Sequence, residues 1–215
     1  MCRSLLLWPM AHRPLPEQTT RAQGQPHTPA RRAASRSCII RPATVADAPH
    51  LPAVEQDAAR AFAAIPALAW LAGGATMPPA AHQTCIATQT CWVGAEATGA
   101  LSAFLSATPL GDTLHIEEMS VALAAQGQGL GRRLLRHACT AAQERGMRHV
   151  TLTTFLAVPW NAPFYGTAGF CIVPPHALDA RLADVLEQEV ALGFARATRC
   201  AMRLDLPPAA QCVSE

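Results

Sequence analysis

The sequence predicts a mixed α/β fold of the α+β kind, in which helices flank a central, mostly antiparallel sheet that contains one parallel pair of strands. Three observations predict it. Strand-like segments outnumber helical ones. A strand at 114–121 is followed by a helix and then by a strand at 149–155, an order that makes the two strands parallel neighbours. Half of the 215 residues are apolar and 15% are charged, which is enough for one domain with its own core.

The first half of the folded part is expected to contain a strand, a helix and three further strands. The short strand Cys38–Arg41 opens it, and Thr44 is expected to cap a helix that runs to about Phe62, with Asp47 near its positive end. Prolines and glycines between residues 63 and 82 predict a mobile loop with one helical turn at most. The strand-like runs that follow are Thr90–Ala95, Leu101–Thr108 and Leu114–Val121.

The second half is expected to alternate helices and strands, beginning with an amphipathic helix from Gly129 to Arg145. The apolar residues on one face of this helix are Leu130, Leu134, Leu135, Ala138 and Ala142. Gly146 ends it. The remaining expected elements are a strand at His149–Phe155, a short helix at Asn161–Ala168, a strand at Phe170–Val173, a helix at Leu178–Leu192 and a strand at Arg199–Leu206.

The N-terminal segment differs from the rest of the chain. Residues 1–37 hold six arginines and five prolines against one acid, Glu17, so they cannot bury enough apolar surface to fold. We expect a disordered extension there, with an organelle-targeting leader or a mis-assigned start as the alternatives. The folded domain is expected over residues 38–206, followed by a short C-terminal tail at 207–215.

The composition argues against several classes of partner and ligand. The net charge of +2 does not indicate nucleic acid or an anionic membrane as a partner. No apolar run approaches the roughly 18 residues that span a bilayer. The eight cysteines form no CxxC pair and have no histidines at zinc-like spacing. We therefore expect reduced thiols, no metal and a cytoplasmic protein, and the sequence leaves a homodimer open.

One glycine-rich turn carries a chemical signal. Residues 126–133 read QGQGLGRR and join the strand at 114–121 to the following helix. Glycines at alternate positions let the backbone approach a ligand, and they present N–H groups at a helix N-terminus, which suits a phosphate. The turn lacks the Lys-Ser/Thr step of a P-loop and the spacing of a dinucleotide-binding fingerprint. A plain tight turn is the alternative.

Two motifs together resemble a known family. The turn, preceded by HIEEMSV, resembles the Q/R-x-x-G-x-G/A acetyl-CoA motif of the GCN5-related N-acetyltransferase (GNAT) superfamily. The segment NAPFYGTAGF, at Asn161 to Phe170, resembles the family's following motif, N-x-x-x-Y-x-x-x-G-F. The order of elements from about residue 38 to 206 also matches. The resemblance implies a GNAT-type sheet whose parallel pair splays apart, and an acyltransferase that uses acetyl-CoA as co-substrate.

The resemblance also implies roles for single residues. The backbone amides that would hold the CoA pyrophosphate are those of Gln126, Gly127, Gln128, Gly129, Leu130, Gly131 and Arg132. The pantetheine arm would pair with the backbone at Met119 and Val121 like an added strand. Asn161 would contact that arm, and Tyr165 would face the sulfur. For Asn161 the alternative is an N-cap of the short helix that follows it.

Tyr165 is the only tyrosine in the chain, and the implied reaction gives it a task. Attack of an amine on the thioester expels a thiolate that needs a proton. A phenol with a pKa near roughly 10 stays protonated at neutral pH and can act as the general acid. The alternative is a ring that is packed for its shape, with its hydroxyl on a backbone carbonyl.

The amine must also lose a proton, since only about one alkylamine molecule in 2,500 is neutral at pH 7. Glu117 and Glu118 lie on the strand that borders the acceptor side. Strict alternation would direct only one of them inward, whereas a bulge would expose both. One would then take the proton while the other binds the ammonium. A solvent-facing carboxylate is the alternative for each, and His115 is a weaker candidate base.

The sequence therefore favours an N-acetyltransferase that acts on a primary amine of a small molecule. The alternatives are acetylation of protein N-termini or lysines, acetylation of an aminoglycoside-like drug, a non-catalytic acyl-CoA-binding module, and a nucleotide-binding interaction domain. The acceptor walls would come from residues 61–82 and 155–195, which are mostly Ala, Leu, Pro and Phe. So few charges favour a small or partly apolar acceptor over a polycation or a long basic peptide.

Overall fold

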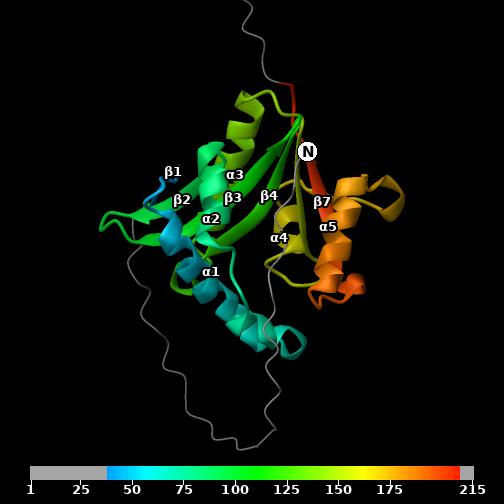
Figure 1. Cartoon of the computed structure of the whole chain (residues 1–215), viewed down its shortest axis with the longest axis horizontal. Helices are drawn as coiled ribbons and strands as arrows, with labels where there is room; N and C mark the ends of the chain where they lie inside the picture. The colour runs from blue at the N-terminus through cyan, green and yellow to red at the C-terminus, as the bar shows by residue number, and fades with distance from the viewer. Residues whose placement is uncertain (1–37, 209–215) are drawn as a thin grey trace, which may run out of the picture. The chain divides into compact units, whose positions relative to one another are not determined.

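Seven strands form one sheet in the computed structural model, which describes residues 38–208 (Figure 1). The strands are β1 Cys38–Pro42, β2 Cys91–Glu96, β3 Leu101–Leu110, β4 Thr113–Val121, β5 His149–Phe155, β6 Cys171–Ile172 and β7 Arg199–Asp205. Their order across the sheet is β1–β2–β3–β4–β5–β7–β6, and every neighbouring pair is antiparallel except β4 and β5. This confirms the mixed, mostly antiparallel sheet. The expected extension at 1–37 and the tail from residue 209 onward lie outside the described residues.

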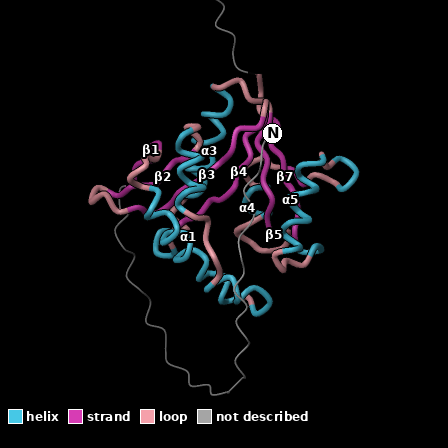
Figure 2. The backbone as a smooth tube through the Cα atoms, in the orientation of Figure 1, coloured by secondary structure: helices cyan, strands magenta, loops and turns pink. Residues whose placement is uncertain are grey.

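The parallel pair is joined over a short stretch only. β4 and β5 pair where Thr113–His115 lies beside His149–Thr151, whereas β4 continues to Val121 and β5 to Phe155. Figure 2 shows the two strands meeting at one end and separating toward the other. Past the paired stretch, the facing backbone edges of these two strands have no strand partner in the described chain, so an extended ligand could pair with them.

Helices cover both faces of the sheet (Figure 1). The α-helices are α1 Leu51–Ala59, α2 Pro79–Ala87, α3 Leu130–Glu144, α4 Ala162–Gly166 and α5 Ala180–Ala191, and the 3₁₀ helices are Ala48–His50, Arg60–Ala64, Pro66–Gly73, Leu123–Ala125, Pro175–Ala177 and Arg196–Thr198. Side chains of β3 alternate between the two faces. Ala103 and Leu105 pack in the core with α3, whereas Phe104 packs in the core with α1 and α2.

The apolar face of α3 fixes the position of this helix. Its buried residues are Leu130, Leu134, Leu135, Ala138 and Ala142, the set expected from the periodicity. Burial of one leucine side chain contributes about 1.5–3 kcal/mol to stability, so this face holds α3 firmly against β3 and β4. Because α3 follows β4 directly, its N-terminus lies at the end where β4 and β5 have separated.

The expected start of the first helix is wrong. Thr44 does not cap a helix, because its hydroxyl donates to the carboxylate of Asp47 at 2.8 Å. The chain instead passes through a turn and a 3₁₀ helix before α1 begins at Leu51. Pro49 and Pro52 lack the backbone N–H groups that a regular helix beginning at Thr44 would need in these turns.

The loop expected at residues 63–82 is also wrong in part. This segment contains the 3₁₀ helix Pro66–Gly73 and the first turn of α2. Pro79 is the first residue of α2, a position where its missing N–H is not needed. Cys85 in this helix is buried against the sheet, in the same core as Phe104. The prolines therefore begin a helix here rather than prevent one.

Candidate active site

The turn between β4 and α3 presents a row of backbone N–H groups. Gly127 and Gly129 have φ values of 72° and 77°, a conformation that glycine adopts at little cost. A Cβ at either position would meet no atom within 4 Å, so the backbone conformation rather than packing requires glycine. Among the described residues, the N–H groups from Gly127 to Arg132 have no hydrogen-bond acceptor. Such a row at the start of a helix fits a pyrophosphate.

Glutamine side chains tie this turn to the chain before it. Gln126 Nε2 donates to the carbonyl of Val121 at 2.9 Å, and Gln128 Nε2 donates to a carbonyl of the preceding 3₁₀ helix at 3.0 Å. Val121 and Met119 are half-buried in the part of β4 that lies beyond its pairing with β5. The turn is thus anchored to the strand along which the pantetheine arm is expected.

The two arginines after the turn lie in different places. Arg132 Nη2 donates to Thr167 Oγ1 at 3.1 Å and so joins the start of α3 to the end of the α4 region. Arg133 Nη2 donates to the carbonyl of Cys38 in β1 at 2.8 Å. The charge of Arg133 is therefore held at the edge of the sheet, and Arg132 is the arginine that stays beside α4.

Asn161 has an open hydrogen-bond acceptor. Its Nδ2 donates to Thr154 Oγ1 of β5 at 2.9 Å, and its side chain makes no capping bond to α4. Its Oδ1 is buried and has no partner among the described residues. A buried acceptor without a donor costs free energy, so this atom fits a ligand that carries an N–H group, as the amides of a pantetheine arm do.

Tyr165 of α4 lies among aromatic rings and is only 7% exposed. Its ring centroid is 5.1 Å from that of Phe164 and 5.7 Å from that of Phe170. Within residues 38–208 its hydroxyl has no hydrogen-bond partner, so it is not fixed to a backbone carbonyl. Burial raises the pKa of Tyr165, the nearby charge of Glu118 raises it further, and Arg199 opposes both. The phenol therefore keeps its proton at neutral pH.

β4 contains a bulge at its two glutamates, so of the two arrangements left open for this strand the bulge is the one observed. Glu118 lies opposite Ser106 of β3, whereas Ile116 lies opposite Ala107, so Glu117 is an extra residue in β4. Because the Ser106 side chain faces α2, Glu118 faces the layer formed by α1 and α2. A bulge re-aims the side chain of the inserted residue, and the charge of Glu117 acts on Cys85 of that same layer.

Glu117 has the more open environment of the two glutamates. Its side chain is exposed to solvent. Partial burial is the largest cause that raises its pKa, and the hydroxyl of Thr108 and the charge of Arg181 on α5 oppose the rise. Because water still reaches this carboxylate, it screens these effects.

Glu118 lies deeper and is closer to the tyrosine. Ser120 Oγ donates to Glu118 Oε1 at 2.8 Å. Burial is the largest cause that raises the pKa of Glu118, while Ser120 and Arg199 oppose the rise. Because Glu118 raises the pKa of Tyr165 in turn, the residue expected to act as general acid and a carboxylate that could accept a proton are within electrostatic reach of each other.

The sequence reasoning missed Glu55 of α1. Its Oε2 accepts the backbone N–H of Met77 at 2.9 Å. Burial, followed by the charge of Glu118, raises the pKa of Glu55 to about 9. A signal was present in the sequence, since Glu55 follows Leu51 by four residues and Val54 by one, on the side of α1 that is buried.

His115 is poorly suited to act as the base. It is buried where β4 and β5 still pair, and its Nδ1 lies 3.0 Å from Thr151 Oγ1. Burial is the main cause that lowers the pKa of His115, to about 3, and Arg181 adds to the effect. A ring that resists protonation this strongly is a weak proton acceptor.

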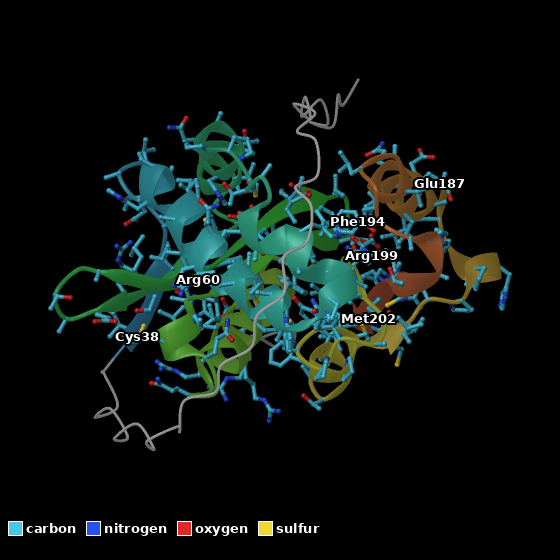
Figure 3. All side chains as sticks on the ribbon, turned by 90° about the horizontal axis from the view of Figure 1, so that it is seen from below. Cys38, Arg60, Glu187, Phe194, Arg199 and Met202 are labelled. Atoms are coloured by element: carbon cyan, nitrogen blue, oxygen red, sulfur yellow. The ribbon has the colours of Figure 1, made fainter. Side chains whose placement is uncertain are left out.

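A set of aromatic rings, here termed the aromatic cluster, gathers three segments far apart in the sequence. Its members are Phe62, Trp70, Phe155, Trp160 and Phe194. Neighbouring ring centroids are 5.2 to 5.7 Å apart. The guanidinium carbon of Arg199 lies 4.5 Å from the centroid of Phe155 and 5.0 Å from that of Phe194, and Figure 3 shows Arg199 beside Phe194. All five residues lie in the two segments, 61–82 and 155–195, from which the acceptor walls were expected to come.

Residues 38–208 contain no group of three or more His, Cys, Asp or Glu side chains placed to hold a metal ion. Within the same residues, every helix is too short or too polar to cross a bilayer.

Comparison with known proteins identifies a family whose model matches this chain. The family model "Acetyltransferase (GNAT) family" matches residues 59–170, which is more than half of the chain. The matched segment includes the bulged strand, the glycine turn, Asn161 and Tyr165.

Solved structures with the same fold are distant in sequence. The N-acetylglutamate synthase from Neisseria gonorrhoeae, complexed with coenzyme A and N-acetyl-glutamate, superposes with a TM-score of 0.56 at 16% identity, over 81% of this chain but only 36% of that one. The ribosomal-protein-S18-alanine N-acetyltransferase from Escherichia coli superposes with a TM-score of 0.53 at 16% identity, over 83% of this chain and 100% of that one. The PaiA N-acetyltransferase from Thermoplasma acidophilum, in complex with coenzyme A, superposes with a TM-score of 0.56 at 14% identity, over 79% of this chain and 99% of that one. At such identities the likeness shows a shared fold.

Proposed function

The chain belongs to the acetyltransferase (GNAT) family, and on that premise we propose that it transfers the acetyl group of acetyl-CoA to a primary amine of a small molecule. The observation that carries the proposal is the unpaired hydroxyl of Tyr165, which lies within electrostatic reach of Glu118. A proton donor and a proton acceptor are thereby available together, as amide formation from an ammonium and a thioester requires.

Backbone groups would hold the co-substrate. The N–H groups from Gly127 to Arg132 would bind the pyrophosphate, and β4 at Met119 and Val121 would pair with the pantetheine arm. The unpartnered Oδ1 of Asn161 would accept a hydrogen bond from an amide N–H of that arm. Acetyl-CoA bound in this way supplies the activated thioester.

Carboxylates would recover the free energy that deprotonation of the amine costs. For an alkylammonium at pH 7 this cost is about 4.6 kcal/mol. Glu118 would take the proton, because it is the less exposed of the two carboxylates and its charge acts on Tyr165. Glu117, which is more exposed, would attract the incoming cation. Tyr165 would then give its proton to the leaving sulfur, since its raised pKa keeps it protonated.

The aromatic cluster supports a small, partly apolar acceptor. Phe62 and Trp160 are in contact with each other, and Trp160 is 43% exposed. Phe155 links this pair to Phe194 and packs under Arg199, whose charge acts on Glu118. An apolar wall this close to the carboxylates suits an acceptor with one amino group and an apolar part better than a polycation.

An amine panel with acetyl-CoA tests the proposal. Thiol release would be measured for alkylamines, arylalkylamines, polyamines, aminoglycosides and short peptides, with the acetylated product verified by mass spectrometry. We expect turnover with small monoamines that is lost in Tyr165→Phe under the same conditions. Turnover confined to peptides would replace the small-molecule acceptor with a protein one. Tight CoA binding without turnover of any amine would indicate a binding module.

A further inference from the structure

Glu55 of α1 and Glu118 of β4 bring two carboxyl groups together between the helical layer and the sheet. Glu55 follows Val54, and both Val54 and Leu51 are buried in the core that α1 shares with the sheet. The N–H of Met77 fixes Glu55 Oε2 at 2.9 Å. α1 packs against β4, and Glu118 faces the layer of α1 and α2, so the two carboxyl groups lie on facing sides of these elements. The charge of Glu118 accordingly raises the pKa of Glu55.

Other charged and titratable groups surround this pair. They are Glu117 of β4, His82 of α2, Tyr165 of α4 and Arg199 of β7. Burial lowers the pKa of His82 to about 4, so the ring is neutral at pH 7. Arg199 is positive, but it already donates to Glu189 at 2.6 Å. Within residues 38–208, neither carboxyl group therefore has an ion pair of its own, although the charge of Arg199 acts on Glu118.

Two half-buried carboxylates on facing elements repel each other when both are charged, and this repulsion favours one proton shared between them. The neighbouring tyrosine independently points to a ligand. Tyr165 is more than nine-tenths buried, its hydroxyl is unpartnered within residues 38–208, and it interacts with Glu118. The Tyr165 hydroxyl is not one of the fully buried unpartnered atoms of residues 38–208, so it is open to an incoming group, and a positively charged donor can enter beside the two carboxyl groups.

Building on the proposed function, we propose that Glu55 and Glu118 together form the ammonium site for the acceptor, with Glu55 selecting a positively charged primary amine. Without the acceptor, the pair holds its shared proton. When the ammonium enters, that proton leaves to solvent, and the three N–H donors of the ammonium replace it.

The protons balance over one turnover. Glu118 takes one proton from the bound ammonium, which leaves a neutral nitrogen that attacks the thioester carbonyl. As the N–C bond forms and the C–S bond breaks, the nitrogen loses a second proton, and Tyr165 relays one to the leaving sulfur. The products are the amide and the CoA thiol. The carboxyl pair has then regained its proton, and the net release is the proton that left when the ammonium bound.

Three variants separate the charge of Glu55 from its structural bond. Glu55→Gln removes the charge but keeps an oxygen that can accept the Met77 N–H. Glu55→Leu removes both. Asp57→Asn is the matched control, because Asp57 is also a carboxylate of α1 that accepts a distant backbone N–H, that of Leu123 at 2.7 Å.

Kinetics and calorimetry give the expected results. Glu55→Gln should raise KM for a monoamine roughly 10- to 100-fold and change kcat by less than about threefold, and its acidic limb of kcat/KM should move to lower pH because Glu118 loses a like-charged neighbour. Amine binding to the wild type, measured by calorimetry in two buffers of different ionisation enthalpy, should release about one proton. Glu55→Gln should release clearly less, and Asp57→Asn should match the wild type.

Several outcomes would overturn the proposal. These are a wild-type pH profile and KM in Glu55→Gln, an equal defect in Asp57→Asn, or a defect that appears only in Glu55→Leu. The free energy of unfolding, measured without substrate at several pH values, tests the pairing of Glu55 with Glu118 even if no amine reacts. Glu55→Gln should become more stable relative to the wild type as pH rises from 5 to 9, because the folded wild type must retain a proton that the unfolded chain releases. If this pH-dependent stability difference is observed but no amine is acetylated, the proposed function is wrong and the carboxyl pair still stands. If the stability difference does not change with pH, the pairing of Glu55 with Glu118 is refuted.

Discussion

Arg199 of β7 and Glu189 of α5 form a two-pronged ion pair, in which Nε and Nη2 of the arginine donate to the two carboxylate oxygens at 2.8 and 2.6 Å. Their side chains are only 10% and 13% exposed. Thr153 Oγ1 of β5 donates to the same carboxylate at 2.6 Å. The pair thus joins α5 to two strands on the side of the aromatic cluster.

Arg199→Lys is expected to destabilise the protein by about 1–3 kcal/mol, because lysine keeps the charge but cannot form the two-pronged contact. The measurement is the urea midpoint of unfolding. Arg203→Lys on the same strand is the control, since Arg203 is 46% exposed and its pairing with Asp205 lies at the surface. Equal midpoints for both variants would show that the buried geometry contributes little.

Gly129→Val is expected to weaken CoA binding roughly 100-fold or more. A residue with a Cβ at a φ of 77° is strained, and relaxing that strain would turn several N–H donors away from the pyrophosphate, each worth about 1.5–3 kcal/mol. Calorimetry with CoA measures the affinity. Gly99→Val introduces similar strain at a φ of 85° in the β2–β3 turn and should leave the affinity unchanged. Undiminished binding by Gly129→Val would remove the turn from the site.

Tyr165→Phe is expected to keep CoA affinity and lower kcat roughly 10- to 1,000-fold, the scale on which general acids contribute. The packing between Phe164 and Phe170 is retained, so unfolding should change little. Since the pKa of Tyr165 is raised, the wild-type rate should show no alkaline decline from this group near pH 10. Wild-type kcat in the variant would leave the ring with a packing role only.

Glu118→Gln is expected to lose kcat/KM most at low pH and to recover as free amine accumulates, because the buried carboxylate no longer takes the proton. Glu117→Gln should instead raise KM with a smaller change in kcat, since this carboxylate is exposed and attracts the cation. Profiles from pH 6 to 9.5 distinguish the two. If Glu117→Gln instead loses kcat/KM at low pH and Glu118→Gln raises KM, Glu117 is the proton acceptor and Glu118 attracts the cation.

Asp47→Asn is expected to cost about 1–2 kcal/mol at pH 7. Asp47 accepts both Arg41 nitrogens, at 2.8 and 2.9 Å, and hydrogen bonding from Arg41 is the largest cause that lowers the pKa of Asp47. A carboxyl with a lowered pKa stabilises the fold above the pKa of the unfolded chain, near 4, and loses this contribution as pH falls. The difference in unfolding free energy should therefore shrink below pH 4. Asp112→Asn, which removes a carboxylate from an exposed site, is the control for the unfolding free energy at pH 7.

Local patterns predicted the parts of the fold that depend on neighbours in sequence. The buried face of α3 follows from the spacing of Leu130, Leu134 and Leu135, whereas the consecutive glutamates of β4 left both strict alternation and a bulge open. The helical role of Pro79 was missed, because proline is favourable at a first helical position and unfavourable elsewhere. Whether a given proline stands at the first position of a helix depends on tertiary packing.

The partners of the candidate site could not be predicted in the same way. Glu55 and Glu118 are separated by more than 60 residues, and they meet because α1 packs over β4. The aromatic cluster likewise joins Phe62 to Phe155 and Phe194 through the order of the strands. Such contacts depend on topology, which periodicity within one segment does not encode.

The short pairing of β4 with β5 gives the sheet a seam. Strands β1 to β4 lie on one side of this seam, and β5, β7 and β6 lie on the other. Direct strand pairing across it is made by the residues of β4 from Thr113 to His115. A pantetheine arm lying in this seam would bond to both sides and close it. Amide hydrogens along the open lengths of β4 and β5 should then exchange more slowly with CoA than without it. The ligand would thus serve as a missing strand and extend the pairing of the two halves of the sheet beyond the short direct contact of β4 with β5.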